Sequence, residues 1–463
     1  MTFGIILPIA TGCWTGPPTN GNNPCYSEHE SFPNGHRYAA MVSKSVAGTY
    51  NIFIEISYDW GQTWEEEQIT SITGGSATGH QMVGSLSADL EGTGLHVTWY
   101  GKGYHSNPHL TYYPSQNYEY SLLYSYRDSL GVWSAGDCTP YTHDATLSVI
   151  DYSGDSQYGV GYPDFRYKNC LYPSMDIDSS GNLHVAYNHW GNWNSAYRTV
   201  WYDTYYRKKL SGLGTWGELA VFRYCYGTVP QMLRPNLQVD SYGNPHITST
   251  IQRPRSGWGA DTVTTCWFMN PSQGDYTAWP LGVRTSHTYT GVFPLGTYSQ
   301  LLYTTAVASG IPSYYSRMAL SHVYDEGTYD YPHCIYSVSH SGVEQGVFHK
   351  YEDGGGWNDV RVNNVWNSIY PSIVIGADGM IYTLARSDPN ATYGYRKKAT
   401  PSDPWSTVEE ITCATVRHVQ NRIPTIYPWD GQDCSPFMGM VGSQATLFRC
   451  GFPPTGDSYG YFM

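Results

Sequence analysis

An internal repeat constrains this chain of 463 residues more than any other feature. Three segments share a proline, an alternating apolar run, an Asp/Gly turn and a second alternating run: YPSMDIDSSGNLHVAYNHW from Tyr172, RPNLQVDSYGNPHITSTIQ from Arg234 and YPSIVIGADGMIYTLARSD from Tyr370. A weaker copy begins at His80, NRIPTIYPWDG from Asn421 opens a last one, and the gap before Tyr370 has room for one more. Alternation of apolar and polar residues predicts strands, and Asp/Gly predicts a tight turn. Each copy therefore predicts an antiparallel strand pair.

Tryptophans run in step with this repeat. Six of them are expected to begin a strand, most after a polar turn: Trp64, Trp133, Trp216, Trp279, Trp357 and Trp405, with Trp279 the least regular. The unit then has four strands, named here A (after the proline), B (after the Asp/Gly turn), C (aromatic-rich) and D (from the tryptophan). A four-stranded unit that recurs every ~40–70 residues is typical of a β-propeller.

We therefore expect an all-β fold with a single β-propeller domain over residues 1–463. Its parts are an N-terminal strand and arm, a first partial blade, five blades and a closing blade: 1–35, 36–70, 79–415 and 422–463. Seven blades are favoured, and six remain if the two partial blades merge. The N-terminal FGIILPI is expected to pair with the last blade, which closes the ring and removes its exposed edges.

Composition excludes several classes of protein. Charged residues are only 14% and the net charge is −13 without a Lys/Arg run, so nucleic-acid binding is not expected. No apolar stretch approaches the roughly 18 residues of a membrane helix. The 10 cysteines form no CxxC, so a zinc knuckle or a thioredoxin-type motif is not predicted, and their pairing stays open. No metal site and no cofactor are expected. The N-terminal run has no preceding Lys or Arg and is a poor signal peptide.

Two motifs carry a resemblance to known families. SYDWGQTW, from Ser57 to Trp64, matches the Asp-box S-x-D-x-G-x-T-W, which is similar to the non-catalytic C–D turn of sialidase-type propellers. IDSSGNLHVAYNHWGNWNSAYR, from Ile177, resembles the BNR-repeat propellers that include ulvan-lyase-type polysaccharide lyases. In that resemblance His184, His189 and the Tyr197-Arg198 pair correspond to the family's motif. It implies a polysaccharide lyase that cleaves a uronic-acid-containing glycan by β-elimination.

The repeat also separates structural from functional residues. His96, His184 and His246 occupy one position at the start of strand B, so we expect them to be buried and hydrogen-bonded to the backbone. His189 has no such counterpart, since Gly101, Ile251 and Ser387 stand at the matching positions. His189 is therefore the strongest functional candidate.

The B–C and D–A loops share one face of a propeller, and the long loops are expected there: 100–118, 138–171, 188–199, 251–263, 283–298 and 385–394. Function concentrates in loops held by a rigid scaffold, so this face should carry the site. The predicted catalytic residues are His189, Arg234 and Arg253. The predicted substrate-binding residues are Trp190, Trp193, Arg198, His105, His109 and Tyr162.

These residue types suit a uronate polymer. Aromatic rings stack on sugars, Arg binds a carboxylate in a bidentate manner, and His takes or gives a proton. A glycoside hydrolase needs two carboxylates, and acids on this face are sparse: Asp144, Asp155, Asp164 and Asp261. The alternative is a non-catalytic glycan-binding or structural propeller, such as a virion fibre, virion decoration or cell-surface protein. The expected partner is a polysaccharide or cell-surface glycan, the expected location is extracellular, secreted or on a virion, and homo-oligomer or virion assembly stays open.

Overall fold

The computed structural model of the chain describes its strands and the turns that connect some of them. The described residues are 7–10, 29–31, 38–46, 49–58, 65–70, 81–89, 94–102, 120–134, 148–151, 165–193, 199–211, 216, 219–222, 231–253, 261–269, 299–307, 316–325, 329–338, 346–363, 371–375, 380–386, 393–411, 416–420, 437–441 and 446–450. They form strands β1 to β28 and no helix, so this part of the chain is all-β. No helix that could cross a membrane is found among them.

The strands pair into seven four-stranded sheets, which we number in chain order. Sheet 1 comprises β2 (His29–Ser31), β3 (Tyr38–Val46), β4 (Thr49–Ser57) and β5 (Glu65–Gln68). Sheet 2 comprises β6 (Gln81–Ala88), β7 (Leu95–Lys102), β8 (Tyr120–Arg127) and β9 (Ser148–Asp151). Sheet 3 comprises β10 (Phe165–Ile177), β11 (Leu183–Trp193), β12 (Thr199–Lys209) and β13 (Leu219–Phe222).

Sheets 4 to 7 repeat this organisation. Sheet 4 comprises β14 (Gln231–Val239), β15 (Pro245–Arg253), β16 (Asp261–Met269) and β17 (Ser299–Val307). Sheet 5 comprises β18 (Ser316–Asp325), β19 (Asp330–Val338), β20 (Gly346–Glu352) and β21 (Trp357–Asn363). Sheet 6 comprises β22 (Ser372–Ile375), β23 (Ile381–Arg386), β24 (Tyr393–Lys398) and β25 (Glu409–Ile411). Sheet 7 comprises β26 (Val416–Gln420), β27 (Phe437–Val441), β28 (Thr446–Cys450) and β1 (Leu7–Ala10).

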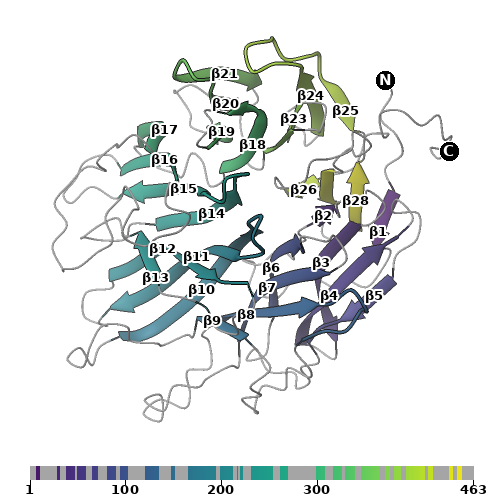
Figure 1. Ribbon diagram of the computed structural model, residues 1–463. Coiled ribbons are helices and arrows are strands. Elements are labelled where there is room, and N and C mark those ends of the chain that lie inside the picture. Colours follow the sequence, from purple (N-terminus) through teal and green to yellow (C-terminus); the bar gives the residue numbers. More distant parts are fainter. Residues whose placement is uncertain are drawn as a thin grey trace.

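The sheets follow one another around the molecule in chain order (Figure 1). Strand A of one sheet lies against strand A of the next, through the contacts β6–β10, β10–β14, β14–β18 and β18–β22. In sheet 7, β1 pairs antiparallel with β28, with Leu7 opposite Arg449. Four-stranded sheets packed side by side in this way are the arrangement expected of a propeller.

The structure corrects two predicted boundaries. Strand D of sheet 4 is β17, in which Ser299 pairs with Phe268, so this strand does not begin at Trp279. Segment 283–298 therefore belongs to the C–D connection and not to the face of the B–C and D–A loops. In sheet 7, strand A is β26, so the last unit begins before Asn421. A strand forms where its backbone finds a partner strand, and local motifs such as an isolated tryptophan do not fix that position.

Two predicted loops also contain strands. Segment 138–171 includes β9, which pairs with β8 as the outer strand of sheet 2. Segment 188–199 is mostly sheet, because β11 continues to Trp193 and β12 resumes at Thr199. The B–C connection of sheet 3 is therefore shorter than predicted, because both of its strands are long.

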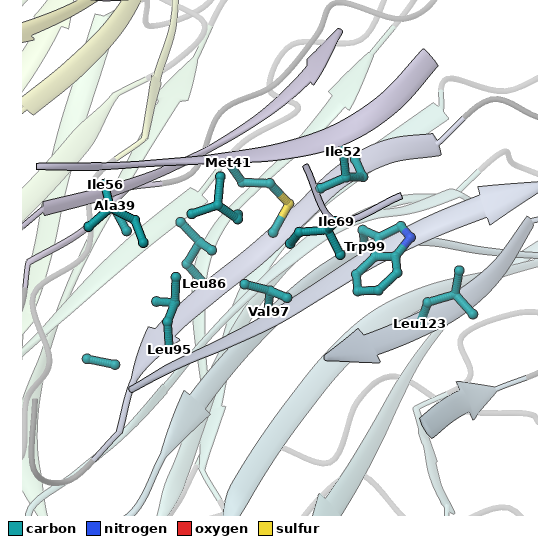
Figure 2. Packing of buried hydrophobic residues seen from close by; sticks show 12 residues of the cluster. Ala39, Met41, Ile52, Ile56, Ile69, Leu86, Leu95, Val97, Trp99 and Leu123 are labelled. Atoms are coloured by element: carbon teal, nitrogen blue, oxygen red, sulfur yellow. The ribbon is translucent and has the colours of Figure 1, made fainter. Parts of the chain in front are cut away.

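Apolar side chains from neighbouring sheets form the core between them. Between sheets 1 and 2, Met41, Leu86, Val97 and Trp99 pack together with no exposed surface (Figure 2). Burying a large aromatic ring of this kind stabilises the fold by about 3–5 kcal/mol relative to alanine. Four of the tryptophans that were expected to begin strand D pack on such clusters: Trp133, Trp216, Trp357 and Trp405. Only Trp357 is the first residue of its strand, whereas strand D of sheet 2 is β9 and does not begin at Trp133.

Short aspartate turns lie on the face of the A–B and C–D connections. Asp128 Oδ1 accepts the backbone N–H groups of Leu130 at 2.9 Å and Val132 at 2.8 Å, and Gly131 has a φ of 86°. This is the turn chemistry that an Asp-box predicts, in which a residue with positive φ favours glycine. The Asp-box itself lies outside the described residues from Asp59 to Trp64.

Histidines at the start of strand B are structural, and their partners differ from the expectation. The side chains of His184 and His246 are fully buried, whereas His96 is partly buried. His184 Nε2 lies 3.1 Å from Asp178 Oδ2 and its Nδ1 lies 2.6 Å from the Tyr206 hydroxyl. These histidines therefore bond to side chains rather than to the backbone groups we expected.

Candidate functional site

Sheet 3 carries the longest strands of the described fold. Strand β10 has 13 residues, and β11 and β12 have 11 each, whereas β14, β15 and β16 of sheet 4 have 9 each. The structural histidines are the second residue of both β11 and β15, so the two B strands start level. The extra length therefore lies at the B–C end, where we predicted the site.

The predicted residue His189 lies near this end of β11, at the position that Ile251 occupies on β15, and Trp193 lies in the extension itself. It pairs with Cys170 on β10 and with Asp203 on β12. Trp190 pairs with Tyr202 and Trp193 with Thr199, without a register shift along the whole β11–β12 ladder. Adjacent strands thus hold the backbone of these residues through a continuous ladder, rather than leaving it on a loop.

The register divides the predicted residues between two faces of sheet 3. Val185 and Tyr187 pack in one buried cluster with Leu122 and Tyr124, so that face meets sheet 2. His189 and Trp193 occupy positions of this face, because side chains alternate along a strand. Trp190 occupies the opposite face, on which Thr204 forms a 3.4 Å hydroxyl contact with Ser249 of sheet 4.

The two predicted arginines lie on sheet 4. Arg234 lies on β14 between Leu233 and Asn236, where the register with β15 shifts. Arg253 ends β15 and pairs with Thr262. Strands β11 and β14 are in contact, so the structure brings the strand of His189 beside the strand of Arg234. Arg198, His105, His109 and Tyr162 lie outside the described residues.

Sequence reasoning missed Asp203. It lies opposite His189, and the corresponding positions of strand C hold Ser121 in sheet 2, Thr264 in sheet 4 and Gly346 in sheet 5. The comparison between repeats that singled out His189 on strand B would have found Asp203, had it been applied to strand C.

The buried histidines on the other face show what a purely structural site looks like. Burial of Asp178 alone would raise the pKa of its carboxyl, but hydrogen bonds from His184 and Asn182 outweigh burial and hold that pKa well below its usual range. Burial lowers the pKa of His184, which leaves a neutral imidazole between Asp178 and Tyr206. These groups are fully used within the fold and have no atom to offer a ligand.

Sheet 5 contains a variant that sequence reasoning also missed. His333 occupies the same position as His184. It pairs with Tyr351 as His184 pairs with Lys208, and its Nδ1 lies 3.0 Å from His349 Nε2, where His184 has Tyr206. Both rings are fully buried, and among the described residues neither His333 Nε2 nor His349 Nδ1 has a hydrogen-bond partner. Burial lowers the pKa of His333 to about 3, with the Lys398 cation adding to the effect.

The described residues form no metal site. Within them, no group of three or more His, Cys, Asp or Glu side chains is arranged to hold a metal ion. Cys334 is a buried free thiol, and burial raises its pKa. The extended end of sheet 3 is therefore the candidate site.

Comparison with solved structures shows that the fold is a β-propeller resembling that of polysaccharide lyases. The polysaccharide lyase Uly1 matches with a TM-score of 0.55 and 10% identity, over 97% of this chain and 97% of that chain. A PL25 ulvan lyase matches with a TM-score of 0.51 and 12% identity, over 89% of this chain and 90% of that chain. An α-L-arabinanase of Penicillium chrysogenum matches with a TM-score of 0.48 and 11% identity, over 98% and 99%. No protein-family model matches the chain, and no curated protein does either.

Proposed function

We propose that the protein is a polysaccharide lyase that cleaves a uronic-acid-containing glycan by β-elimination. The observation that carries the proposal is His189, which breaks the repeat at the extended end of sheet 3. The likeness of the fold to Uly1 and to an ulvan lyase supports the same class of substrate.

The scaffold in this proposal is a ring of seven blades. The seven four-stranded sheets support that number, and the pairing of β1 with β28 supports closure by the N-terminal strand. Closure would remove the exposed edges of the first and last units. We further propose that the protein acts outside the cell, as a secreted or virion-surface protein.

The reaction needs three groups. Arg234 or Arg253 binds the uronate carboxylate, which stabilises the negative charge that develops beside it. His189 accepts the C5 proton as the general base, the C4–O bond breaks, and a C4=C5 double bond forms. A nearby tyrosine returns a proton to the leaving oxygen, so the products are an unsaturated uronate and a free hydroxyl. Trp190, Trp193, Arg198, His105, His109 and Tyr162 hold the neighbouring sugars.

The rise in ultraviolet absorbance of unsaturated uronate products tests this proposal. We expect the unaltered protein to give the rise on a uronate polymer such as ulvan, and His189→Ala to abolish it with folding intact by circular dichroism. Ile251→Ala is the matched control, because Ile251 lies at the corresponding position of strand B in sheet 4. Full activity of His189→Ala would refute the mechanism.

The second candidate function is a non-catalytic glycan binder. It is favoured by the aromatic residues at this end of sheet 3, where Trp190 pairs with Tyr202 and Gly191 pairs with Trp201. In that case no uronate polymer gives the absorbance rise, yet Trp193→Ala still weakens retention on a glycan column. A structural role in a virion would leave both measurements unchanged between the variants.

A further inference from the structure

Asp203 and His189 break the repeat at the same rung of the same sheet. They are direct partners across β11 and β12, where the other sheets pair Gly101 with Ser121 and Ile251 with Thr264. A titratable residue at both positions thus occurs in sheet 3 alone among these three sheets.

We propose that Asp203 is a positioning residue that orients His189 and sets its protonation for proton abstraction. This inference rests on the proposed function of His189. Residues directly opposite in an antiparallel pair have Cβ atoms about 4.5–5.5 Å apart, which is within reach of a carboxylate and an imidazole. A carboxylate partner on one ring nitrogen fixes the tautomer and leaves the other nitrogen for the substrate.

The structural histidines show how this pair differs from a fold-stabilising one. His184 and His246 obtain their carboxylates, Asp178 and Asp240, from the A–B turn of their own sheet. Both of those pairs are buried on the opposite face of the molecule. His189 is five residues further along the strand, and its carboxylate comes from strand C at the end of the sheet that carries the extension.

Burial and a neighbouring carboxylate shift the pKa of a histidine in opposite directions. Burial lowers the pKa of His184, so that imidazole stays neutral and is a poor proton acceptor. A carboxylate within about 4–6 Å raises the pKa of a histidine, because it favours the charged form. A base with a pKa nearer to neutrality accepts a proton more effectively in the transition state.

Neighbouring positions on the same face suit a uronate beside this pair. At the next position outward on this face, Gly191 pairs with Lys168 on β10 and with Trp201 on β12. Glycine carries no side chain, lysine is a cation and tryptophan is a stacking surface for sugars. The register thus assigns a proton acceptor and residue types that recognise an anionic sugar to positions on one face of sheet 3.

Nuclear magnetic resonance titration of the histidine rings tests the inference without any substrate. The His189 signals are assigned as those missing from His189→Ala. We expect Asp203→Asn to lower the midpoint of the His189 titration by about one to three pH units. Asp203→Glu should restore most of it, because glutamate returns the charge.

The matched control is Asp261→Asn, which removes a carboxylate from the same end of strand C in sheet 4. The inference is overturned if His189 titrates identically in the unaltered protein and in Asp203→Asn, or if Asp261→Asn causes the same shift. In the lyase assay we expect Asp203→Asn to reduce kcat at least tenfold, to change KM little and to move the acidic limb of the pH profile downward. A protein that shows the titration shift but no lyase activity refutes the proposed function alone.

Discussion

Replacing His333 with asparagine should make the stability of the protein less sensitive to acid. The imidazole of His333 is fully buried, and no residue in the described part of the chain forms a hydrogen bond with its Nε2 that could accommodate a proton. Burial, reinforced by the Lys398 cation, lowers its pKa to about 3. In the unfolded chain the pKa returns to about 6.5.

The size of the effect follows from proton linkage. Between about pH 6.5 and pH 3, the unfolded chain binds one more proton at this residue than the folded chain. The free energy of unfolding therefore falls as the pH falls, by about 1.4 kcal/mol per pH unit. From about pH 7 to about pH 5, the residue accounts for a loss on the order of 2 kcal/mol.

Urea unfolding followed by tryptophan fluorescence at both pH values measures this loss. Asparagine keeps an amide that can donate to His349 but cannot be protonated in this range. His333→Asn should be less stable at about pH 7, yet lose about 2 kcal/mol less than the unaltered protein on acidification. Equal losses in both proteins would refute the account of His333 as a buried neutral imidazole.

Three further predictions concern the scaffold. His184→Ala should lower the free energy of unfolding by about 1–3 kcal/mol, because it leaves Asp178 and Tyr206 without their shared partner, and thermal denaturation measures it. Gly84→Ala should cost about 1–3 kcal/mol, since a Cβ there would collide with the Thr98 carbonyl and lie 2.6 Å from a side-chain atom of the next sheet; unchanged urea stability would contradict this. Deletion of residues 422–463 should lower the melting temperature of the whole protein if the ring is closed, and a truncated protein that melts like the full chain would refute closure.

Much of the strand pattern could be predicted from the sequence because each signal is local. Alternating residues and Asp/Gly turns fix strands A and B, and β10–β11 and β14–β15 follow them closely. Strand D is less predictable, because it is an outer strand held by one neighbour. The pairing of Ser299 with Phe268 across a long connection is a tertiary event that Trp279 could not reveal.

Part of the candidate site could likewise be predicted from the sequence, and part could not. His189 could be found from the sequence, because comparison of the repeats isolates a residue that one strand position does not share. Its partner Asp203 depends on the register between β11 and β12, which the chain adopts only when both strands join sheet 3. The same holds for the two faces of the sheet, since alternation tells which residues share a face but not which neighbouring sheet that face meets.

The sequence by itself determined the repeating four-stranded unit, the turn residues and the histidine that departs from the repeat, because periodicity and backbone preference act over a few residues. Only the tertiary structure decided where strand D of sheet 4 begins and that His184 bonds to side chains rather than backbone. It also decided that His189 lies opposite Asp203. These features depend on strand partners and packed neighbours that are distant along the chain, and no local pattern encodes their register.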